Sequence, residues 1–440
     1  MNSARGIAVE VVKKIFCDNA YSSIVLNKYL NKSDLNKKDR ALTTELVYGT
    51  LKYKYTIDCI LKNFIKSDLE KMNKDVLNML RISIYQLRYL DKIPEFAVVN
   101  EAVEFSKGIS MKLSKLVNGV LRNYLRNKDN LSFVNKEDKI CFEYSFPRWM
   151  AELFINQYGE DLGKYIMDSL NIVPKVTVRI NTLKTDYKGA WNELSINGYD
   201  VKKGNVYKDA LIINKGSSIE MNPLFEKGHV TVQDESAMLV SYFMDVKENM
   251  SVLDLCSAPG GKSCHMGELM RNTGSIQCFD LYESKLSLVR NNAERLGVKN
   301  ITCKKLDAAK YSEKLKNTAD RVLIDVPCSG LGIIRKKPEI KWNKKENSMK
   351  SLIEIQRKII LNASRYVKTG GKLVYSTCTL NKKENEENIN WFISQNSQYK
   401  LDKLYCGEFP NIIYHKEGYM TILPDKDMDG FFIARLIKQR

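Results

Sequence analysis

The sequence predicts an α/β protein in which a doubly wound, mostly parallel sheet follows an α+β extension and an all-helical module. From residue 250 onward, short apolar runs alternate with amphipathic patterns, which is typical of parallel strands joined by right-handed helical crossovers. Residues 1 to about 130 instead show helical periodicity throughout. The stretch between them contains two alternating, strand-like runs. We therefore expect domains at 1–130, 131–235 and 236–440.

The N-terminal module is expected to be a basic helical domain. Pro94 breaks the chain before one helical pattern, and Gly108 is a suitable C-cap for it. An apolar stripe over 113–124 predicts the next helix, and its cations lie off that stripe at Lys112, Lys115, Arg122, Arg126 and Lys128. Such a module can bind RNA. It can equally be a helix bundle whose cations face water.

The middle segment begins with a polar-to-aromatic transition over 131–150, which we take as a domain boundary. Residues 150–170 have a helical pattern. Val176–Asn181 and Gly228–Gln233 alternate like strands. A mixed α+β extension therefore precedes the main sheet.

The C-terminal region supplies the parallel sheet. Helical patterns cover 284–296, which ends at Gly297, and 352–367, which ends at the Gly370-Gly371 pair. The tail at 430–437 indicates a further strand. The other expected strands are Ser251–Cys256, Ser275–Asp280, Ile301–Asp307, Arg321–Val326 and Lys372–Cys378.

Composition limits the class of protein. The 440 residues contain 70 Lys and Arg against 52 Asp and Glu, a net charge of +18 that favours a polyanionic partner, although a solvated basic surface would also explain it. No apolar run approaches the ~18 residues of a membrane span, and the N-terminus lacks an export signal, so a cytoplasmic protein is expected. The ten cysteines include no Cys-x-x-Cys pair and the three histidines lie far apart, so we expect no bound metal.

Acidic residues and a glycine loop mark the candidate cofactor site. Asp residues stand at or near the ends of four expected strands, and ligands of open α/β sheets lie beyond such ends. These residues are Asp254, Asp280, Asp307 and Asp325. The loop Ala258-Pro-Gly-Gly-Lys262 allows close approach of backbone to a ligand, and Lys262 could pair with a carboxylate. The loop is neither Gly-x-Gly-x-x-Gly nor a Walker loop, which disfavours dinucleotides and ATP. Each Asp alone could be a cap or turn residue.

Two cysteines also follow apolar strand runs. Cys328 lies in Asp325-Val-Pro-Cys-Ser-Gly and Cys378 in Tyr375-Ser-Thr-Cys-Thr. Either one alone could be a small buried hydrophobe. Two thiols beside a nucleotide-type cofactor indicate covalent chemistry on an electrophilic ring.

These motifs, in this order over 250–380, resemble the S-adenosylmethionine-dependent RNA 5-methylcytosine methyltransferases of the Nol1/Nop2/Sun group. The resemblance implies a Rossmann-like methyltransferase core with S-adenosyl-L-methionine as cofactor. It assigns Asp280 to the ribose hydroxyls, Asp307 to the adenine side and Asp325 to the site between cofactor and base. The methionine moiety is assigned to Cys256, Ser257, Ala258, Pro259, Gly260, Gly261 and Lys262.

A second resemblance concerns the helical module. Asp39-Arg-Ala-Leu and Glu45-Leu-Val-Tyr-Gly-Thr-Leu51 are similar to the RNA-binding fold of the antitermination factor NusB. Residues 178–184 and 233–237 resemble the segment that precedes the catalytic core. The fusion implies a bacterial enzyme for 16S rRNA, acting before 30S assembly is complete. We expect RNA as the partner, no membrane partner and a monomer.

The chemistry implied by the group requires a nucleophile for carbon 6 of cytosine, a group at N3 and a base for the carbon 5 proton. The DNA-type enzymes attack with the cysteine of Pro-Cys, which would nominate Cys328. The RNA group uses the second motif, so we favour Cys378 as nucleophile, with Cys328 assisting proton removal or enzyme release and Asp325 at N3. Tyr375 and Trp342 are candidates for holding the extruded base. Arg335-Lys-Lys-Pro338 is either a phosphate contact or a solvated loop.

Two other functions stay open on the sequence. A relative in the same group could methylate tRNA or 23S rRNA instead. The chain could also be a catalytically silent RNA-binding assembly factor, although the cofactor loop, Asp325 and both cysteines argue against that.

Overall fold

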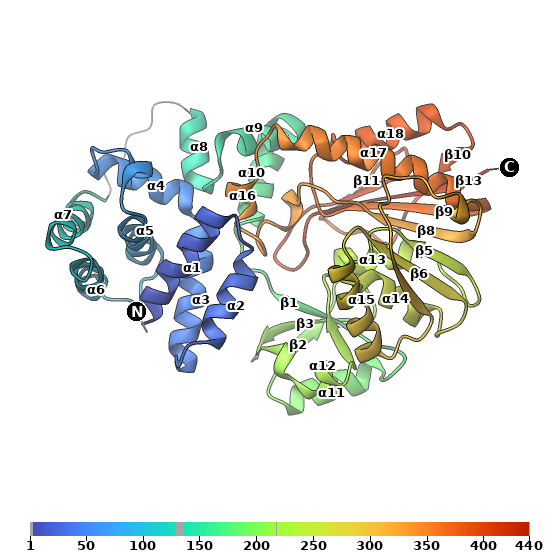
Figure 1. Cartoon of the computed structure of the whole chain (residues 1–440), viewed down its shortest axis with the longest axis horizontal. Helices are drawn as coiled ribbons and strands as arrows, with labels where there is room; N and C mark the ends of the chain where they lie inside the picture. Colours follow the sequence, from blue (N-terminus) through green and yellow to red (C-terminus); the bar gives the residue numbers. More distant parts are fainter. Residues whose placement is uncertain (1–2, 129–135, 217, 440) are drawn as a thin grey trace. The chain divides into compact units, whose positions relative to one another are not determined.

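The computed structural model describes residues 3–128, 136–216 and 218–439, and they form two compact units (Figure 1). Unit 1 comprises Met1–Asn171 and Ile334–Glu346, and unit 2 comprises Ile172–Ile333 and Asn347–Arg440. The expected boundary at residue 130 lies outside the described residues, and the division into three domains stays a prediction. Within the described part of the chain, no helix is long and apolar enough to cross a membrane.

Unit 1 is helical, as its periodicity predicted. Helix α5 is buried along most of its length, and other helices pack around it. Pro94 precedes α6 and Gly108 caps it, and the five cations expected off the α7 stripe are exposed. The helices are α1 (Ala4–Asp18), α2 (Ser22–Asn31), α3 (Lys37–Lys52), α4 (Lys54–Phe64), η1 (Leu69–Lys71), α5 (Lys74–Tyr89), α6 (Glu95–Lys107), α7 (Met111–Asn127), α8 (Lys136–Tyr144), α9 (Arg148–Tyr158), α10 (Glu160–Ser169) and α16 (Ile340–Asn343).

A segment from far along the chain completes unit 1. We call Ile334–Glu346, which contains α16, the strap. The Lys341 side chain is buried, and its Nζ donates to the carbonyl oxygens of Lys52 at 3.1 Å and Ser145 at 3.0 Å and to Asn171 Oδ1 at 2.8 Å. A buried amine is tolerated here because three oxygen acceptors replace its water.

Two more side chains of the strap are fixed in the same unit. The buried Glu339 carboxylate accepts from the backbone N–H of Ser22 at 3.1 Å and from its hydroxyl at 2.8 Å. Trp342 Nε1 donates to the Leu51 carbonyl at 2.7 Å. The strap therefore satisfies polar groups of α2 and α3 that burial would otherwise leave without partners.

Unit 2 begins with a small antiparallel sheet in the order β2-β3-β1-β4. Its apolar face packs on the flanking helices, with Val178 and Ile180 against Ala190 and Leu194. The elements are β1 (Val176–Ile180), α11 (Tyr187–Ile196), β2 (Asp200–Lys203), β3 (Ala210–Lys215), η2 (Ile219–Met221), α12 (Pro223–Glu226) and β4 (Val230–Val232). These elements form the predicted α+β extension.

The main sheet of unit 2 is nine-stranded within the described residues and runs β11-β12-β13-β9-β8-β5-β6-β7, with β10 paired to β13. The run from β9 to β7 is parallel, and β10 to β13 add antiparallel strands. The strands are β5 (Ser251–Asp254), β6 (Ser275–Asp280), β7 (Ile301–Lys305), β8 (Ala319–Asp325), β9 (Val367–Thr377), β10 (Tyr399–Leu401), β11 (Ile412–Tyr414), β12 (Met420–Ile422) and β13 (Phe431–Lys438). This confirms the doubly wound, mostly parallel fold class.

Helices cover both faces of this sheet (Figure 1). Successive side chains of a strand point to opposite faces, so Ile324 packs on the α17 side and Leu323 on the side of α13, α14 and α15. Because both faces are buried, the strands are apolar runs rather than alternating ones. The helices are α13 (Glu235–Phe243), α14 (Gly261–Leu269), α15 (Glu283–Leu296), η3 (Glu313–Leu315), η4 (Leu331–Ile333), α17 (Ser348–Tyr366) and α18 (Glu386–Gln395).

One helix end differs from the prediction. Gly297 caps α15 in the left-handed region as expected, but α17 ends at Tyr366 rather than at the glycine pair. Gly370 (φ 77°) and Gly371 lie inside β9, where the register with β8 shifts between Ala319 and Arg321. The glycines therefore shape an irregularity in a strand and do not stop a helix.

Candidate active site

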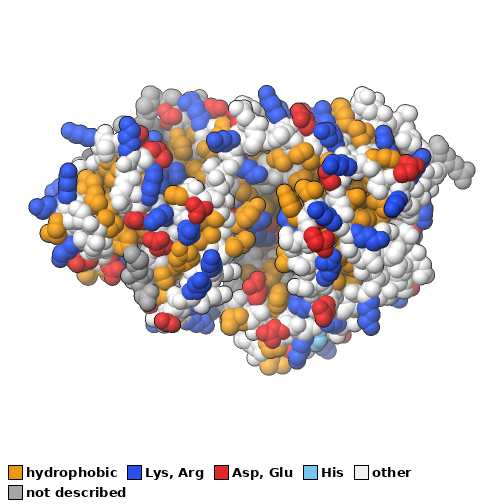
Figure 2. Space-filling model, viewed as in Figure 1, with side chains coloured by type: hydrophobic (Ala, Val, Ile, Leu, Met, Phe, Trp, Pro, Cys, Tyr) orange, Lys and Arg blue, Asp and Glu red, His pale blue; other side chains and the backbone are white. Residues whose placement is uncertain are grey.

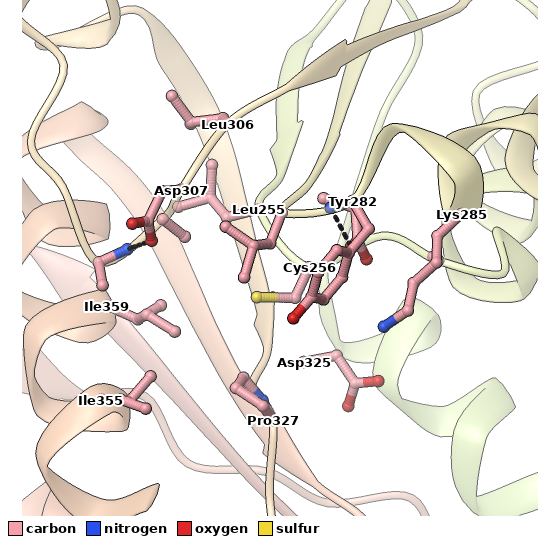
Figure 3. Close-up of a pocket in the computed structure, with 15 residues that line it drawn as sticks. Leu255, Cys256, Tyr282, Lys285, Leu306, Asp307, Asp325, Pro327, Ile355 and Ile359 are labelled. Atoms are coloured by element: carbon pink, nitrogen blue, oxygen red, sulfur yellow. Dashed lines mark hydrogen bonds between the residues drawn. The ribbon is translucent and has the colours of Figure 1, made fainter. Parts of the chain in front are cut away.

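Three carboxylates line one cavity at the edge of the main sheet. Strands β6 and β8 end at Asp280 and Asp325, and Asp307 follows β7. Parallel strands bring their carboxyl ends to the same edge, so these side chains converge. The cavity has a volume of about 240 Å³ (Figure 3). Its other lining residues are Leu255, Cys256, Ala258, Leu281, Tyr282, Lys285, Leu306, Ala308, Ala309, Pro327, Ile355 and Ile359.

The cavity has an acidic part and an apolar part. Asp280 and Asp307 each accept one backbone hydrogen bond at 3.1 Å within their own turn, from Tyr282 and Ala309. Figure 3 shows the aliphatic side chain of Ile359 near Asp307, whereas Cys256 points toward the middle of the cavity. Burial, followed by the surrounding carboxylates, raises the pKa of Cys256 well above its ordinary value, so this sulfur is a neutral thiol.

These features suit a cationic nucleoside ligand. Three carboxylates and the ammonium of Lys285 line the cavity, and Lys262 pairs with one of the carboxylates, Asp325, so a small negative balance is left in a chain whose net charge is +18. A phosphate-bearing cofactor would meet repulsion there, whereas the sulfonium and amino groups of S-adenosyl-L-methionine would meet attraction. Carboxylate oxygens can accept from ribose hydroxyls, and the aliphatic walls suit a purine. The residues present therefore fit this cofactor.

The glycine loop shapes the cavity more than it lines it. Of the seven residues expected at the methionine moiety, Cys256 and Ala258 line the cavity. The hydroxyl and backbone N–H of Ser257 both donate to the Phe279 carbonyl. Gly260 has φ 103° and packs against α15, where a Cβ would lie 3.0 Å from Val289 Cα. The described lining does not include Pro259, Gly260, Gly261 or Lys262.

Lys262 pairs with a carboxylate, as predicted. Its Nζ donates to Asp325 Oδ2 at 2.7 Å, and the Ser376 hydroxyl donates to Asp325 Oδ1 at 2.8 Å. Burial lowers the pKa of Lys262, but the attraction and hydrogen bond of Asp325 outweigh it, and the net pKa is raised. Lys262 is therefore charged, and Asp325 is held from two sides at the border of the cavity.

The two candidate thiols lie together. Cys328 follows β8 and Cys378 follows β9, and these parallel strands are neighbours with Asp325 opposite Ser376. The two Sγ atoms are 3.4 Å apart, within sulfur hydrogen-bond distance. The hydrogen bond to Cys378 and burial raise the pKa of Cys328 well above its ordinary value. Cys328 therefore keeps its proton and can donate it to the Cys378 sulfur.

The structure overturns one of the two aromatic candidates for holding a base, Tyr375, whereas Trp342 stays a prediction. Tyr375 is fully buried, and its hydroxyl donates to the Glu384 carbonyl, so its ring belongs to the core. Trp342 lies in the strap of unit 1. Arg335 and Pro338 are also in the strap and are buried, whereas Lys337 is exposed, so the run 335–338 is only partly solvated and its contact with phosphates stays a prediction.

Two groups of residues were missed by the sequence reasoning. Arg179 of β1 is fully buried; it pairs with Glu268 of α14 at 2.6 Å and donates to the Gly261 carbonyl at 3.1 Å. Arg179 stands in an alternating strand, and that pattern did not predict a buried ion pair with Glu268. Glu384 is a buried carboxylate behind the thiol loops. In the sequence, Glu384 is distinguished only by its position six residues after Cys378. The charged run around it is typical of a solvated helix start, so its burial was not predicted.

Comparison with known families matches most of the chain. Residues 241–437 match the family described as 16S rRNA methyltransferase RsmB/F, and residues 2–126 match the NusB family. Residues 146–220 match the ferredoxin-like domain of the RsmF/B-like methyltransferases.

Individual relatives are similar over the full length. The chain is 39% identical to the probable ribosomal RNA small subunit methyltransferase B of Bacillus subtilis (strain 168), covering 99% of both. It is 30% identical to ribosomal RNA small subunit methyltransferase B of Pectobacterium atrosepticum, covering 99% of this chain and 98% of the relative.

Solved structures show the same fold. The crystal structure of PH0851 covers 99% of each chain at 27% identity, with a TM-score of 0.85. The structure of NSun6 from Pyrococcus horikoshii with SFG covers 68% of this chain and 99% of that one at 24% identity, with a TM-score of 0.60.

Proposed function

The chain belongs to the ribosomal RNA small subunit methyltransferase B family, whose members are S-adenosyl-L-methionine-dependent, and we propose that it methylates carbon 5 of cytosine 967 in 16S rRNA. The observation that carries the cytosine chemistry is the thiol pair. Two sulfur atoms 3.4 Å apart lie at neighbouring strand ends, beside an aspartate that borders the cofactor cavity. A methyltransferase acting on an already nucleophilic atom would not need this arrangement.

Carbon 5 of cytosine is a poor nucleophile, so the ring must be activated. The Cys378 thiolate forms a bond to carbon 6, which turns carbon 5 into an enamine-like centre. Bound S-adenosyl-L-methionine supplies the methyl group as an electrophile. The carbon 5 proton then leaves to a base, the electron pair of that C–H bond restores the ring double bond, and the bond from Cys378 to carbon 6 breaks.

Three side chains have the remaining roles. The Asp325 carboxylate accepts a hydrogen bond from the exocyclic amine, and from N3 once N3 carries a proton, which stabilises charge on the ring as carbon 6 is attacked. Lys262 orients Asp325 through its 2.7 Å contact. Cys328 assists proton removal or release of the product. The 3.4 Å separation of the two sulfur atoms places Cys328 within reach of the Cys378 sulfur for this exchange of a proton.

The cofactor roles follow the cavity. We assign Asp280 to the ribose hydroxyls and Asp307 to the adenine side, where Leu306, Ile355 and Ile359 provide apolar walls. We assign the loop from Cys256 to Lys262 to the methionine moiety. The acidic lining supports this assignment, because the ligand's positive charges would lie beside carboxylates.

RNA recognition is assigned to the NusB-like unit 1. Lys and Arg side chains are distributed over the face shown in Figure 2 with acidic groups among them, so charge alone marks no single patch there. The exposed cations of α7 support a backbone contact, because they lie along one helix. We propose a cytoplasmic monomer that acts on 16S rRNA before 30S assembly is complete.

The test uses the purified protein with labelled S-adenosyl-L-methionine and RNA from a strain that lacks the gene. Deproteinised 16S rRNA, 23S rRNA and tRNA are offered separately, and modified cytosines are mapped by bisulfite sequencing. We expect label in 16S rRNA at cytosine 967. Label confined to tRNA or 23S rRNA would overturn the substrate, and cofactor binding without methyl transfer to any RNA would favour an assembly factor.

A further inference from the structure

Glu384 is a buried carboxylate that accepts four hydrogen bonds. It lies between β9 and α18 and has no exposed surface. Its Oε2 accepts from the backbone N–H of Ser329 and from Gln356 Nε2, both at 2.9 Å. Its Oε1 accepts from the Ser329 hydroxyl and, at 3.0 Å, from Asn381 Nδ2. Burial of an ionised group is costly unless it is saturated in this way.

The donors come from the two segments that carry the thiols and from one helix. Ser329 follows Cys328 directly, and Asn381 lies three residues after Cys378. Gln356 is on α17 and also donates to the Pro327 carbonyl at 2.9 Å, one residue before Cys328. Glu384 therefore hydrogen-bonds residues close to each thiol, and its charge also acts on Cys328, whose pKa it helps to raise.

A second contact joins the two thiol segments directly. The hydroxyls of Ser329 and Thr379, the residues that follow the two cysteines, are 2.7 Å apart. Because Ser329 also donates to Glu384, the carboxylate fixes the rotamer of one partner in this contact. Hydrogen bonds to an ionised acceptor are stronger than hydrogen bonds between neutral groups. The segments that carry Cys328 and Cys378 are therefore fixed more firmly than the contact between the two hydroxyls alone would fix them.

We propose that Glu384 is a positioning residue that holds the Cys328 and Cys378 segments at the separation at which a proton passes between the two sulfur atoms. This inference rests on the proposed function, since the proton transfer matters only if both thiols act on the RNA base. The residue acts mainly through its hydrogen bonds with Ser329, Asn381 and Gln356. A displacement of about 1 Å in such a site can reduce rates ~100-fold.

The variants are Glu384→Gln and its neighbour Glu386→Gln as a matched control. Gln keeps one acceptor oxygen but presents an NH₂ group where two donors now point. Glu386 is also buried and lies two residues away, but it contacts Thr421 and His415 rather than the thiol segments. Glu384→Asp keeps the negative charge, but its side chain is one methylene shorter, so the carboxylate lies farther from its donors.

The first measurement is single-turnover methyl transfer at saturating RNA and cofactor. We expect a loss of about 10- to 100-fold in Glu384→Gln, with cofactor affinity by calorimetry within about twofold because Glu384 does not line the cavity. Glu384→Asp should retain more activity than Gln, and Glu386→Gln should stay within about twofold of wild type. Methyl transfer within twofold of wild type in Glu384→Gln would overturn the proposal.

The second measurement needs neither RNA nor cofactor. Diamide takes two electrons and two protons from the thiols as the Cys328–Cys378 disulfide forms, and peptide mass spectrometry follows the bond. We expect formation about tenfold slower in Glu384→Gln, because the effective concentration of one thiol at the other falls. Loss of methyl transfer with an unchanged disulfide rate would overturn the positioning role.

These two measurements separate this proposal from the proposed function. Wild-type protein that methylates no RNA would refute the function, while the disulfide rates would still report the role of Glu384. If Glu384→Gln does not fold, as judged by circular dichroism, the same two rates are compared in Glu384→Asp. An unchanged disulfide rate in a folded Asp variant would then count against the proposal.

Discussion

The Sγ atoms of Cys328 and Cys378 lie 3.4 Å apart, although fifty residues separate them in the chain. Their proximity follows from the parallel pairing of β8 and β9, in which Asp325 is opposite Ser376. Each thiol then lies two or three residues beyond the same level of the sheet. A shift of the register by two residues would move the sulfur atoms apart by roughly 6 Å.

The two cysteines should give opposite results when they are removed singly. We expect Cys328→Ala, mixed with cognate RNA and cofactor, to accumulate a covalent protein–RNA adduct, because attack proceeds but release is impaired. Cys378→Ala should form none, because the nucleophile is absent. Denaturing gel electrophoresis detects the adduct. An adduct in Cys378→Ala but not in Cys328→Ala would reverse the assignment, and the double variant is the negative control.

Lys262→Met should impair the chemical step. Lys262 Nζ is 2.7 Å from Asp325, so its loss leaves that carboxylate held only by Ser376. We expect kcat to fall at least about 10-fold, the equivalent of one lost charge-assisted hydrogen bond. Steady-state kinetics measure this. Lys310→Met is the control, because Lys310 also lies near a site carboxylate, Asp307, but is largely exposed. Equal effects in the two variants would refute the specific role.

Removing one member of the buried pair of Arg179 and Glu268 should destabilise the protein more than removing both. Arg179→Met leaves the Glu268 carboxylate buried without its cation, which we expect to lower the free energy of unfolding by about 3–5 kcal/mol. Replacing both residues with Met should cost less than this single change. Denaturant unfolding of unit 2 within the full chain measures the effect. Arg271→Met removes a largely exposed pair with Glu248 and should cost under about 1 kcal/mol.

Asp254 should make stability depend on pH. Burial, and secondarily the charge of Asp325, raise its pKa to about 7, against about 3.9 in an unfolded chain. The folded state therefore binds this proton more tightly, and the associated stability is complete below about pH 4 and lost as the pH rises to about 7. The amide introduced by Asp254→Asn cannot ionise, so that variant lacks this dependence.

The unfolding free energy of Asp254→Asn minus that of wild type should therefore increase from pH 4 to pH 7, by an amount on the order of 4 kcal/mol, and then level off. Urea unfolding across this range, without added cofactor, measures the difference. Asp161→Asn, at an exposed position in α10, is the control for the removal of a carboxylate. A flat difference for Asp254→Asn would contradict the raised pKa.

Lys341→Met should destabilise unit 1. It removes a donor from two backbone carbonyls and from Asn171, and each buried acceptor left without a partner costs about 1–3 kcal/mol. We expect a loss of more than about 2 kcal/mol, measured by hydrogen exchange in α3. Lys337→Met changes an exposed lysine of the same strap and should have little effect. Similar exchange in both variants would show that the buried amine is dispensable.

The sequence predicted the site residues that stand at the ends of parallel strands, because a local apolar run marks the strand and the sheet topology brings the strand ends together. Asp280 and Asp325 stand at the ends of apolar runs, and parallel strands necessarily bring such ends together. A pairing of Lys262 with a carboxylate was predicted because the helix that follows the first strand starts at that edge, but its partner, Asp325, came from the structure. The parallel strands were therefore predictable, with limits that moved by up to five residues, as with β9, whereas the short strands β2, β3, β10, β11 and β12 were not predicted.

The residues that the sequence did not reveal are those whose role depends on distant partners. Glu384 stands in the charged run Lys382-Lys-Glu-Asn-Glu386, which a local view assigns to solvent. Arg179 alternates with apolar neighbours as a surface residue would, but its partners Glu268 and Gln233 lie far from it in the chain. The burial of Arg335 and Pro338 likewise depends on distant residues, because the strap that contains them belongs to unit 1.

The strap also constrains how the protein is made. Synthesis runs from the N-terminus, so residues 1–171 leave the ribosome well before residues 334–346 exist. Until then, the Leu51, Lys52 and Ser145 carbonyls lack their final donors. The first unit to be translated is thus finished only after three quarters of the chain has been read, when Cys328 has already been added. An isolated N-terminal fragment would represent this nascent form rather than the mature one.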